Sequence, residues 1–274
     1  MTVCAGRTCV VTGGSRGIGL ATARAFAAAG GQVAIGDIDA EAASAAAAEI
    51  GRGAIGLELD VADPVAWERF AEEVEDRLGP VDVLVSNAGV MAIGPFSEEP
   101  AERALRQVAI NLDGVILGVK RVLPGMLERR RGHLVNVASA AGKTAYPGGA
   151  TYCASKHGVV GLSEALRDEL RGTGVGISLV MPGVVATELT SGLRTPRGVR
   201  PVGPERVGAE IVAAVERDRF SVYVPRTMGV ATKAMLAMPR PLADRVRAMA
   251  GAGSFLVDVD AAGRAGYEGR IGSS

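Results

Sequence analysis

Three polar residues in the middle of the chain have the types and spacing needed to exchange a proton with an alcohol oxygen. Tyr152 and Lys156 are four residues apart in a segment of helical periodicity, so their side chains share one face. A tyrosine of pKa about 10 is a poor base at neutral pH, but a neighbouring ammonium favours the phenolate and lowers that pKa. Ser139 ends the preceding apolar run and can hydrogen bond to the same substrate oxygen. We therefore expect Tyr152 to transfer the proton and Lys156 to be its electrostatic partner.

A tyrosine and a lysine at this spacing are also common on solvated helix faces, so the context of the pair matters. Tyr146 has no charged partner at helical spacing, because Ala150 follows it by four residues. We interpret Tyr146 as a pocket or packing residue. The interpretation of Tyr152 and Lys156 as a catalytic pair is stronger because they follow a predicted strand that ends in Ser139, downstream of a candidate phosphate loop.

That loop lies between the first predicted strand and the first predicted helix. It reads Thr12-Gly13-Gly14-Ser15-Arg16-Gly17-Ile18-Gly19. Glycines let the backbone turn sharply and approach a pyrophosphate closely, and the start of a helix directs N–H groups at it. A glycine cluster elsewhere would be weak evidence, but at this position it predicts a dinucleotide site.

Asp37 ends the second predicted strand, about twenty residues beyond the glycines. A carboxylate there can accept both adenosine ribose hydroxyls and repels a 2′-phosphate, which favours NAD over NADP. Arg16 could instead pair with a 2′-phosphate. Because Ile38 and Asp39 supply no second base beside Asp37, we expect NAD, with NADP as the alternative.

The elements that position these residues alternate between short β-branched runs and longer Ala-rich helical segments. The predicted strands are Thr8–Thr12, Gln32–Gly36, Ala54–Leu59, Val81–Ser86, His133–Ala138, Val175–Met181 and a weaker one at Phe220–Val224. The predicted helices are Ile18–Ala29, Glu41–Ile50, Val65–Leu78, Glu102–Arg130, Tyr152–Arg171 and Pro204–Arg217. The alternation predicts an α/β fold with a parallel sheet of about seven strands, flanked by helices on both faces.

We expect one Rossmann-like, doubly wound domain over residues 1–225, which holds the cofactor and catalytic sites, and a C-terminal helical tail over residues 226–274. Met228–Met238 and Leu242–Met249 read as short amphipathic helices before a Gly-rich end. The tail either closes an edge of the same domain or acts as a lid or partner-binding segment.

Composition narrows the classes of function. Thirty basic residues balance thirty acidic ones, which gives no reason to expect nucleic acid as a partner. No apolar run is long enough for a membrane span, and the start lacks a signal peptide, so we expect a cytoplasmic protein. Cys4, Cys9 and Cys153 suit reduced, buried thiols, and His133 and His157 are too far apart for a metal site, so we expect no metal.

The joint pattern resembles the short-chain dehydrogenase/reductase (SDR) family over about residues 5 to 224. The matching residues are the glycine loop, Asn87-Ala88-Gly89, Asn111, Ser139, Tyr152-x-x-x-Lys156 and Pro182-Gly183-Val-Val-Ala-Thr187. The resemblance implies an NAD(P)-dependent oxidoreductase that acts on CH–OH groups.

The resemblance also implies roles for residues that the pattern alone does not assign. In the family, the Asp at Asp60-Val61 contacts adenine, the Asn at Asn111 holds a water in a proton relay, and the lysine at Lys156 also binds the nicotinamide ribose. The expected catalytic residues are Asn111, Ser139, Tyr152 and Lys156. The expected cofactor-binding residues are Gly13, Ser15, Arg16, Gly17, Ile18, Gly19, Asp37, Asp60, Val61, Asn87, Ala88, Gly89, Tyr152, Lys156, Pro182, Gly183, Val185 and Thr187. Backbone groups near Val185 and the Thr187 hydroxyl would meet the nicotinamide carboxamide.

Substrate choice should depend on the segments 91–96, 143–149 and 188–202, which are mostly apolar and glycine-rich. We expect a lipophilic secondary alcohol or its ketone, although Arg194, Arg197 and Arg200 could equally receive an acyl-linked or anionic substrate. The family suggests a homodimer or homotetramer, but the chain lacks the family's usual final strand, which leaves the tetramer open.

Three alternatives remain open at this point. The chain could be an NADP(H)-dependent carbonyl reductase, or a nucleotide-sensing protein that has lost turnover. It could also use NAD transiently, as an epimerase or dehydratase does. Net NADH production with a test alcohol separates a dehydrogenase from the last two.

Overall fold

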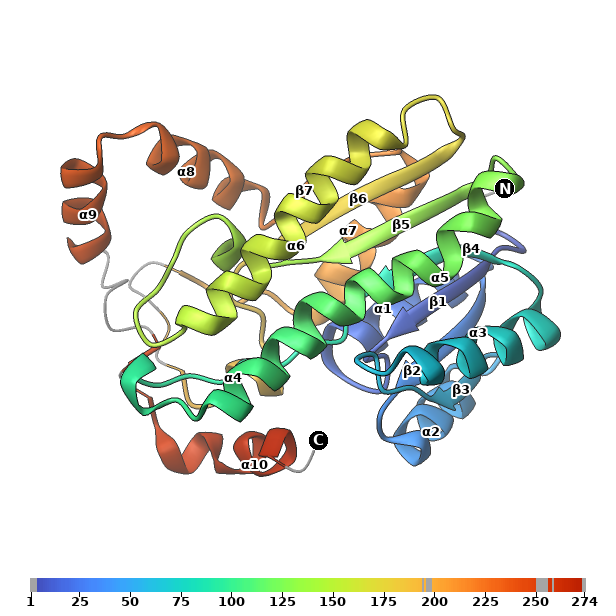
Figure 1. The fold of residues 1–274 in the computed structure, drawn as a ribbon, viewed down its shortest axis with the longest axis horizontal. Helices are drawn as coiled ribbons and strands as arrows, with labels where there is room; N and C mark the ends of the chain where they lie inside the picture. The colour runs from blue at the N-terminus through green and yellow to red at the C-terminus, as the bar shows by residue number, and fades with distance from the viewer. Residues whose placement is uncertain (1–3, 194, 196–198, 250–255, 258, 273–274) are drawn as a thin grey trace.

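Seven parallel strands form the centre of the structure, in the order β3-β2-β1-β4-β5-β6-β7 (Figure 1). The structure is a computed structural model and describes residues 4–193, 195, 199–249, 256, 257 and 259–272. The strands are β1 (Thr8–Thr12), β2 (Gln32–Asp37), β3 (Ile55–Glu58), β4 (Val81–Ser86), β5 (Gly132–Val137), β6 (Val175–Pro182) and β7 (Ser221–Val224). Strand order reverses between β1 and β4, so the carboxyl ends of these two strands border the crevice where such sheets bind ligands.

Helices cover both faces of the sheet (Figure 1). One layer is formed by α1 (Gly17–Ala28), α2 (Ala40–Ile50) and α7 (Pro204–Glu216), and the other by α3 (Pro64–Leu78), α5 (Gly114–Glu128) and α6 (Ala150–Glu169). Two of these helices begin at capping residues that can be recognised in the sequence. The Asp39 carboxylate accepts a hydrogen bond from the Ala42 N–H at 3.0 Å and caps α2, and Asp63 caps α3, which begins at Pro64.

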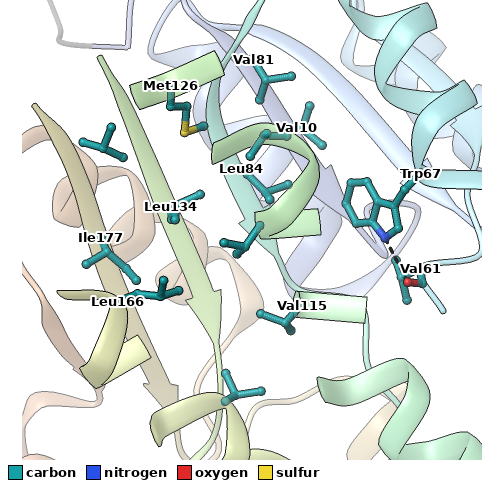
Figure 2. Close-up of a cluster of buried hydrophobic side chains, with 14 of the residues drawn as sticks. Val10, Val61, Trp67, Val81, Leu84, Val115, Met126, Leu134, Leu166 and Ile177 are labelled. Atoms are coloured by element: carbon teal, nitrogen blue, oxygen red, sulfur yellow. Dashed lines mark hydrogen bonds between the residues drawn. The ribbon is translucent and has the colours of Figure 1, made fainter. Parts of the chain in front are cut away.

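The core is divided into two layers because successive strand residues point to opposite faces. In β1, Val10 packs toward α3, α5 and α6, whereas Cys9 and Val11 pack toward α1, α2 and α7. Figure 2 shows the first of these layers, in which the Trp67 indole donates a hydrogen bond to the Val61 carbonyl at 3.0 Å. Apolar side chains on both faces explain why the strands read as continuous hydrophobic runs.

The structure confirms the α/β fold, the seven parallel strands and the helices on both faces. One predicted helix is wrong in detail. Residues 102–130 form two helices, α4 (Ala101–Val108) and α5, joined by a π-helical turn at Ala109–Asp113. Asn111 lies in this turn, and its side chain binds the backbone of Val90 in place of facing solvent. A π-helical turn widens the helix locally and often marks a functional site.

The tail contains the two predicted helices, here α8 (Arg226–Ala237) and α9 (Arg240–Met249). α8 packs on the edge strand β7, where a Cβ at Gly229 would lie 2.7 Å from the Tyr223 ring. The Gly-rich end contains a further helix, α10 (Ala261–Gly272), which the sequence analysis missed. Figure 1 shows α10 returning to lie beside α4. The division of the chain at residue 225 stays a prediction.

Cys4, Cys9 and Cys153 are buried and form no disulfide with one another. Within the described residues, no helix combines the length and the apolar character that crossing a membrane requires.

Candidate active site

A cavity of about 490 Å³ lies at the carboxyl ends of the central strands. Its wall brings together most of the residues that were predicted from the sequence. These are Gly13, Arg16, Gly17, Ile18, Asp37, Asp60, Val61, Asn87, Ala88, Gly89, Ser139, Tyr152, Lys156, Pro182, Gly183, Val185 and Thr187. Three predicted residues, Ser15, Gly19 and Asn111, do not line the cavity.

The predicted catalytic side chains converge from two adjacent elements. Tyr152 and Lys156 project from the first turns of α6, and Ser139 follows β5. The Lys156 ammonium lies 6.0 Å from the centre of the Tyr152 ring. It donates a hydrogen bond to the Val137 carbonyl at 3.1 Å, which fixes its position beside the tyrosine. The helical spacing of four residues therefore places both groups on one cavity wall.

Burial controls the acidity of this pair. Burial raises the pKa of the Tyr152 phenol well above its usual value, and the hydrogen bond with Ser139 opposes this shift less strongly. Burial also lowers the pKa of Lys156 to about 8. Desolvation of the phenol therefore opposes the lowering of the tyrosine pKa that we expected from the ammonium, and the roles of the pair stay a prediction. Lys156 is therefore the first of the two groups to lose its proton as the pH rises.

Asn111 stands behind the cavity and is fully buried. Its amide nitrogen donates hydrogen bonds to the Val90 carbonyl at 2.9 Å and to the Ser155 hydroxyl at 3.1 Å. Its amide oxygen accepts a hydrogen bond from the Val90 N–H at 2.8 Å. The Ser155 hydroxyl in turn donates to the Tyr152 carbonyl at 2.8 Å. Asn111 thus ties the loop after β4 to the helix that carries the catalytic pair.

The glycine loop leaves no room for side chains at its closest approaches. A Cβ at Gly19 would lie 2.0 Å from the Gly13 carbonyl oxygen and 2.7 Å from the Asn87 amide nitrogen. That nitrogen donates hydrogen bonds to the carbonyls of Thr12 at 2.9 Å and Gly13 at 3.1 Å. Asn87, the residue that follows β4, therefore holds the glycine loop in place, and the backbone of the loop faces the cavity, where it can bind phosphate groups.

Asp37 is oriented by the loop itself. One carboxylate oxygen accepts hydrogen bonds from the Ser15 N–H at 3.1 Å and the Ser15 hydroxyl at 2.6 Å. The other accepts a weaker one from the Asp39 N–H at 3.3 Å. A carboxylate has about four acceptor positions, so the second oxygen keeps one for a ribose hydroxyl. Ser15 therefore positions Asp37, and the predicted acceptance of both ribose hydroxyls would require Ser15 to move.

Each arginine that lines the cavity is ion-paired within the described residues. The pairs are Arg16 with Asp39 at 3.1 Å, Arg106 with Asp60 at 2.8 Å, and Arg270 with Glu188 at 2.5 Å. Such pairing matters at Arg16, which was the candidate partner for a 2′-phosphate, because a phosphate would have to compete with Asp39 for the guanidinium.

Tyr152 also belongs to a buried apolar cluster that lies beside the cavity. Its other members are Met91, Ala141, Cys153 and Leu256, and Ile93, Tyr146, Leu189 and Leu193 pack against them. Of these residues only Tyr152 and Leu189 line the cavity itself. Tyr146 is thus a packing residue near the site, as expected. Arg200 is exposed, and Arg194 and Arg197 lie outside the described residues.

Sequence reasoning missed Arg106, Tyr267 and Arg270 among the cavity-lining residues. Tyr267 and Arg270 belong to α10, which is separated from the catalytic residues by more than a hundred positions. The tyrosine and the charged residues in this Gly-rich end indicated that the segment contacts another part of the molecule. Their spacing did not indicate that this part is the cavity.

The family is settled by a match over most of the chain. The sequence profile described as short chain dehydrogenase matches residues 7–198. The chain belongs to this family. It is therefore an NAD(P)-dependent oxidoreductase that acts on CH–OH groups. The matched range includes the glycine loop, Tyr152 and Lys156.

Relatives and solved structures extend the likeness beyond the profile. The short-chain dehydrogenase is 40% identical over 228 residues to 1-deoxy-11-beta-hydroxypentalenate dehydrogenase of Streptomyces exfoliatus, covering 79% of this chain and 82% of the relative. It is 34% identical over 247 residues to the ketoacyl reductase HetN of Nostoc, covering 87% and 86%. A Burkholderia phymatum family member in complex with NAD superposes with a TM-score of 0.79 at 28% identity, covering 85% and 94%. A metagenomic short-chain oxidoreductase in complex with NADP superposes with a TM-score of 0.69 at 33% identity, covering 80% of this chain and 96% of the other.

Proposed function

We propose that this short-chain dehydrogenase interconverts a lipophilic secondary alcohol and its ketone with NAD(H). One observation carries the proposal: Ser139, Tyr152 and Lys156 line the same cavity as the glycine loop and Asp37. Gly13 and Gly19 allow the loop to pack closely against Ala88 and against itself, and this shape leaves its backbone facing the cavity, as the pyrophosphate of a dinucleotide requires. A complete proton-transfer set beside this cradle favours turnover over a nucleotide-sensing role.

The chain's own residues then divide the work around the reacting carbon. Bound NAD supplies the hydride acceptor for alcohol oxidation, and NADH the donor for the reverse reaction. Ser139 holds the substrate oxygen near Tyr152, and Tyr152 takes the hydroxyl proton on oxidation or returns it on reduction. Lys156 stabilises the phenolate as it forms. The apolar cluster around Tyr152 excludes water and favours a substrate with hydrocarbon beside its oxygen.

The names of two relatives agree with this substrate class, since one is named for a hydroxy compound and the other for a ketoacyl compound. Oxidation of a panel of secondary alcohols of increasing size, followed by the absorbance of NADH, tests the proposal. Turnover of small polar polyols alone would contradict the lipophilic class, and no net NADH from any alcohol would favour a sensor or an enzyme that uses NAD transiently.

We expect kcat/KM to favour NAD over NADP by about 100-fold, because a carboxylate facing a 2′-phosphate costs several kcal/mol. Asp37 supplies that charge, and Asp39 and Glu188 both lie within ion-pair distance of Arg16. Asp37→Asn keeps the shape and removes the charge, so the preference should narrow to about tenfold. Steady-state kinetics with both cofactors measures the ratio.

Asp76→Asn is the matched control, because Asp76 is an exposed residue of α3 that does not line the cavity. It removes the same charge and should leave the cofactor ratio unchanged. Equal use of NAD and NADP by the unaltered enzyme would favour the alternative, an NADP(H)-dependent carbonyl reductase.

The rate of alcohol oxidation should rise with pH through about 8. Oxidation releases the hydroxyl proton to the catalytic pair, so the pair must first be able to accept a proton. Burial lowers the pKa of Lys156 to about 8, and kcat/KM for oxidation should therefore rise about tenfold per pH unit below pH 8 and level above it. Ketone reduction should fall over the same range. A flat profile between pH 6 and 10 for a step limited by chemistry would contradict the assignment of the proton-transfer pair.

A further inference from the structure

A buried guanidinium in the tail binds the two loops that wall the substrate side of the cavity. Arg264, on α10, is only 2% exposed. Its Nη1 group donates hydrogen bonds to the carbonyls of Leu189 at 3.0 Å and Ser191 at 3.2 Å. Its Nη2 group donates to the Met91 carbonyl at 2.6 Å, and its Nε to the Glu268 carboxylate at 2.7 Å. A buried charge is tolerated only when its donors are satisfied in this way.

These carbonyls belong to segments far apart in the chain. Met91 lies in the loop after β4, and Leu189 and Ser191 lie in the segment after β6. Leu189 lines the cavity, and Met91 packs in the cluster around Tyr152. The planar fork of an arginine can hold several carbonyls in a fixed mutual arrangement, which one flexible ammonium cannot do. Arg264 therefore sets the separation of the two loops.

The backbone of the tail is joined to the same segment independently of Arg264. The Asp260 N–H donates a hydrogen bond to the Gly192 carbonyl at 2.9 Å, and Leu193 forms an antiparallel bridge with Val259. Gly192 has a φ of +70°, and a Cβ there would lie 2.5 Å from the Asp260 carbonyl oxygen. This close approach explains why a glycine is required at that point of the substrate-side segment.

One helical turn beyond Arg264, Tyr267 extends the wall into the cavity. Its hydroxyl accepts a hydrogen bond from the Met91 N–H at 2.8 Å, and its ring lies 4.6 Å from the Arg264 guanidinium. Glu268, the carboxylate partner of Arg264, is also ion-paired with Arg103 of α4. Tyr267 and Glu268 thus hold the Arg264 side chain in place next to the two loops.

We propose that Arg264 is a positioning residue, which holds the loops 89–93 and 187–193 so that the substrate side of the cavity keeps its shape beside Tyr152. The α10 end of the tail is then part of the active site, whereas α8 closes the edge of the sheet at β7. The effect on substrate binding rests on the proposed function, whereas the effect on the loops does not. Within the described residues, the Arg264 guanidinium donates hydrogen bonds to these loops and to Glu268, and none to the glycine loop or Asp37.

Hydrogen–deuterium exchange of the full chain tests the positioning without any need for turnover. In Arg264→Met, which keeps a long side chain without its donors, amide exchange over residues 89–93 and 187–193 should rise about tenfold. Exchange in α1 and β5 should stay unchanged. Arg171→Met is the matched control, since Arg171 is exposed and its ion pair, with Asp168, lies at the surface. Unchanged exchange in both loops would overturn the proposal.

Kinetics then separate positioning from a general loss of stability. For Arg264→Met we expect KM for a lipophilic alcohol to rise about tenfold. The dissociation constant of NADH should rise less, by about threefold at most, because only Gly89 and Thr187 of the predicted cofactor-binding residues lie in the two loops. Arg264→Lys should reverse only a small part of this rise in KM, because lysine lacks the planar fork of the guanidinium. Tyr267→Phe, which removes one acceptor, should raise exchange near residues 91 and 92 alone. If amide exchange rose throughout the protein, and KM and the dissociation constant of NADH rose by the same factor, Arg264 would have a merely structural role. If the unaltered enzyme oxidised no alcohol, the proposed function would fail and the exchange result would still decide the role of Arg264.

Discussion

Tyr152→Phe should lower kcat by about a thousandfold while NADH binds with nearly unchanged affinity. The ring of Tyr152 packs against Met91, Ala141, Cys153 and Leu256, and phenylalanine keeps these contacts. Only the hydroxyl is lost, and with it the group that exchanges the proton with the substrate oxygen. Single-turnover kinetics with a saturating alcohol measure the chemical step, and NADH fluorescence measures binding.

Tyr223→Phe is the matched control for this substitution. Tyr223 lies in β7, packs against the core and does not line the cavity, so removal of its hydroxyl should leave kcat unchanged. A Tyr152→Phe enzyme with near-normal kcat would assign the proton transfer to another group. Ser139 would then be the first residue to test, because it lines the same cavity beside Tyr152.

The fold could be predicted from the sequence because its signals are local. Most strands are short runs rich in β-branched residues, and Gly, Pro or Asp marks the ends of several helices, as Asp39 and Asp63 do. The cavity could be predicted for a related reason. In a parallel sheet the loops after successive strands meet at one edge, so Gly13, Asp37 and Ser139 had to lie near one another.

The π-helical turn at Asn111 and the helix α10 could not be predicted, because they depend on contacts between distant segments. The π-helical turn at Asn111 interrupts a region whose apolar pattern continues, and it is fixed by hydrogen bonds to Val90 that no local pattern reveals. α10 has four glycines at every third position, Gly263, Gly266, Gly269 and Gly272, and a glycine inside a helix disfavours it by about 1 kcal/mol relative to alanine. Tertiary contacts of Arg264 and Tyr267 offset that propensity, and these contacts exist only in the folded chain.

Gly19→Ala should lower the affinity for NADH by about 100-fold, or about 2.7 kcal/mol. The added Cβ would lie 2.0 Å from the Gly13 carbonyl oxygen. That oxygen belongs to the backbone and the Cβ is attached directly to it, so no change of side-chain rotamer can relieve the overlap. Relief of this overlap must therefore move the glycine loop away from α1 and disturb its hydrogen bonds with Asn87. The cradle for the pyrophosphate would lose its shape even though no side chain that touches the cofactor has changed. NADH titration and thermal unfolding measure the two effects, and we expect a lower Tm as well.

Gly161→Ala is the matched control, because it makes the same substitution in a helix where nothing opposes it. Gly161 is an exposed residue of α6, and a Cβ there would meet no atom within 4 Å. Alanine favours a helix by about 1 kcal/mol relative to glycine, so this variant should be more stable and raise Tm by about 2–4 °C. Opposite signs for one substitution at two helix positions would show that the close approach at Gly19, and not the propensity of glycine, shapes the cofactor loop. Unchanged NADH affinity in Gly19→Ala would instead mean that the loop tolerates displacement, and the pyrophosphate would have to be held elsewhere on the cavity wall.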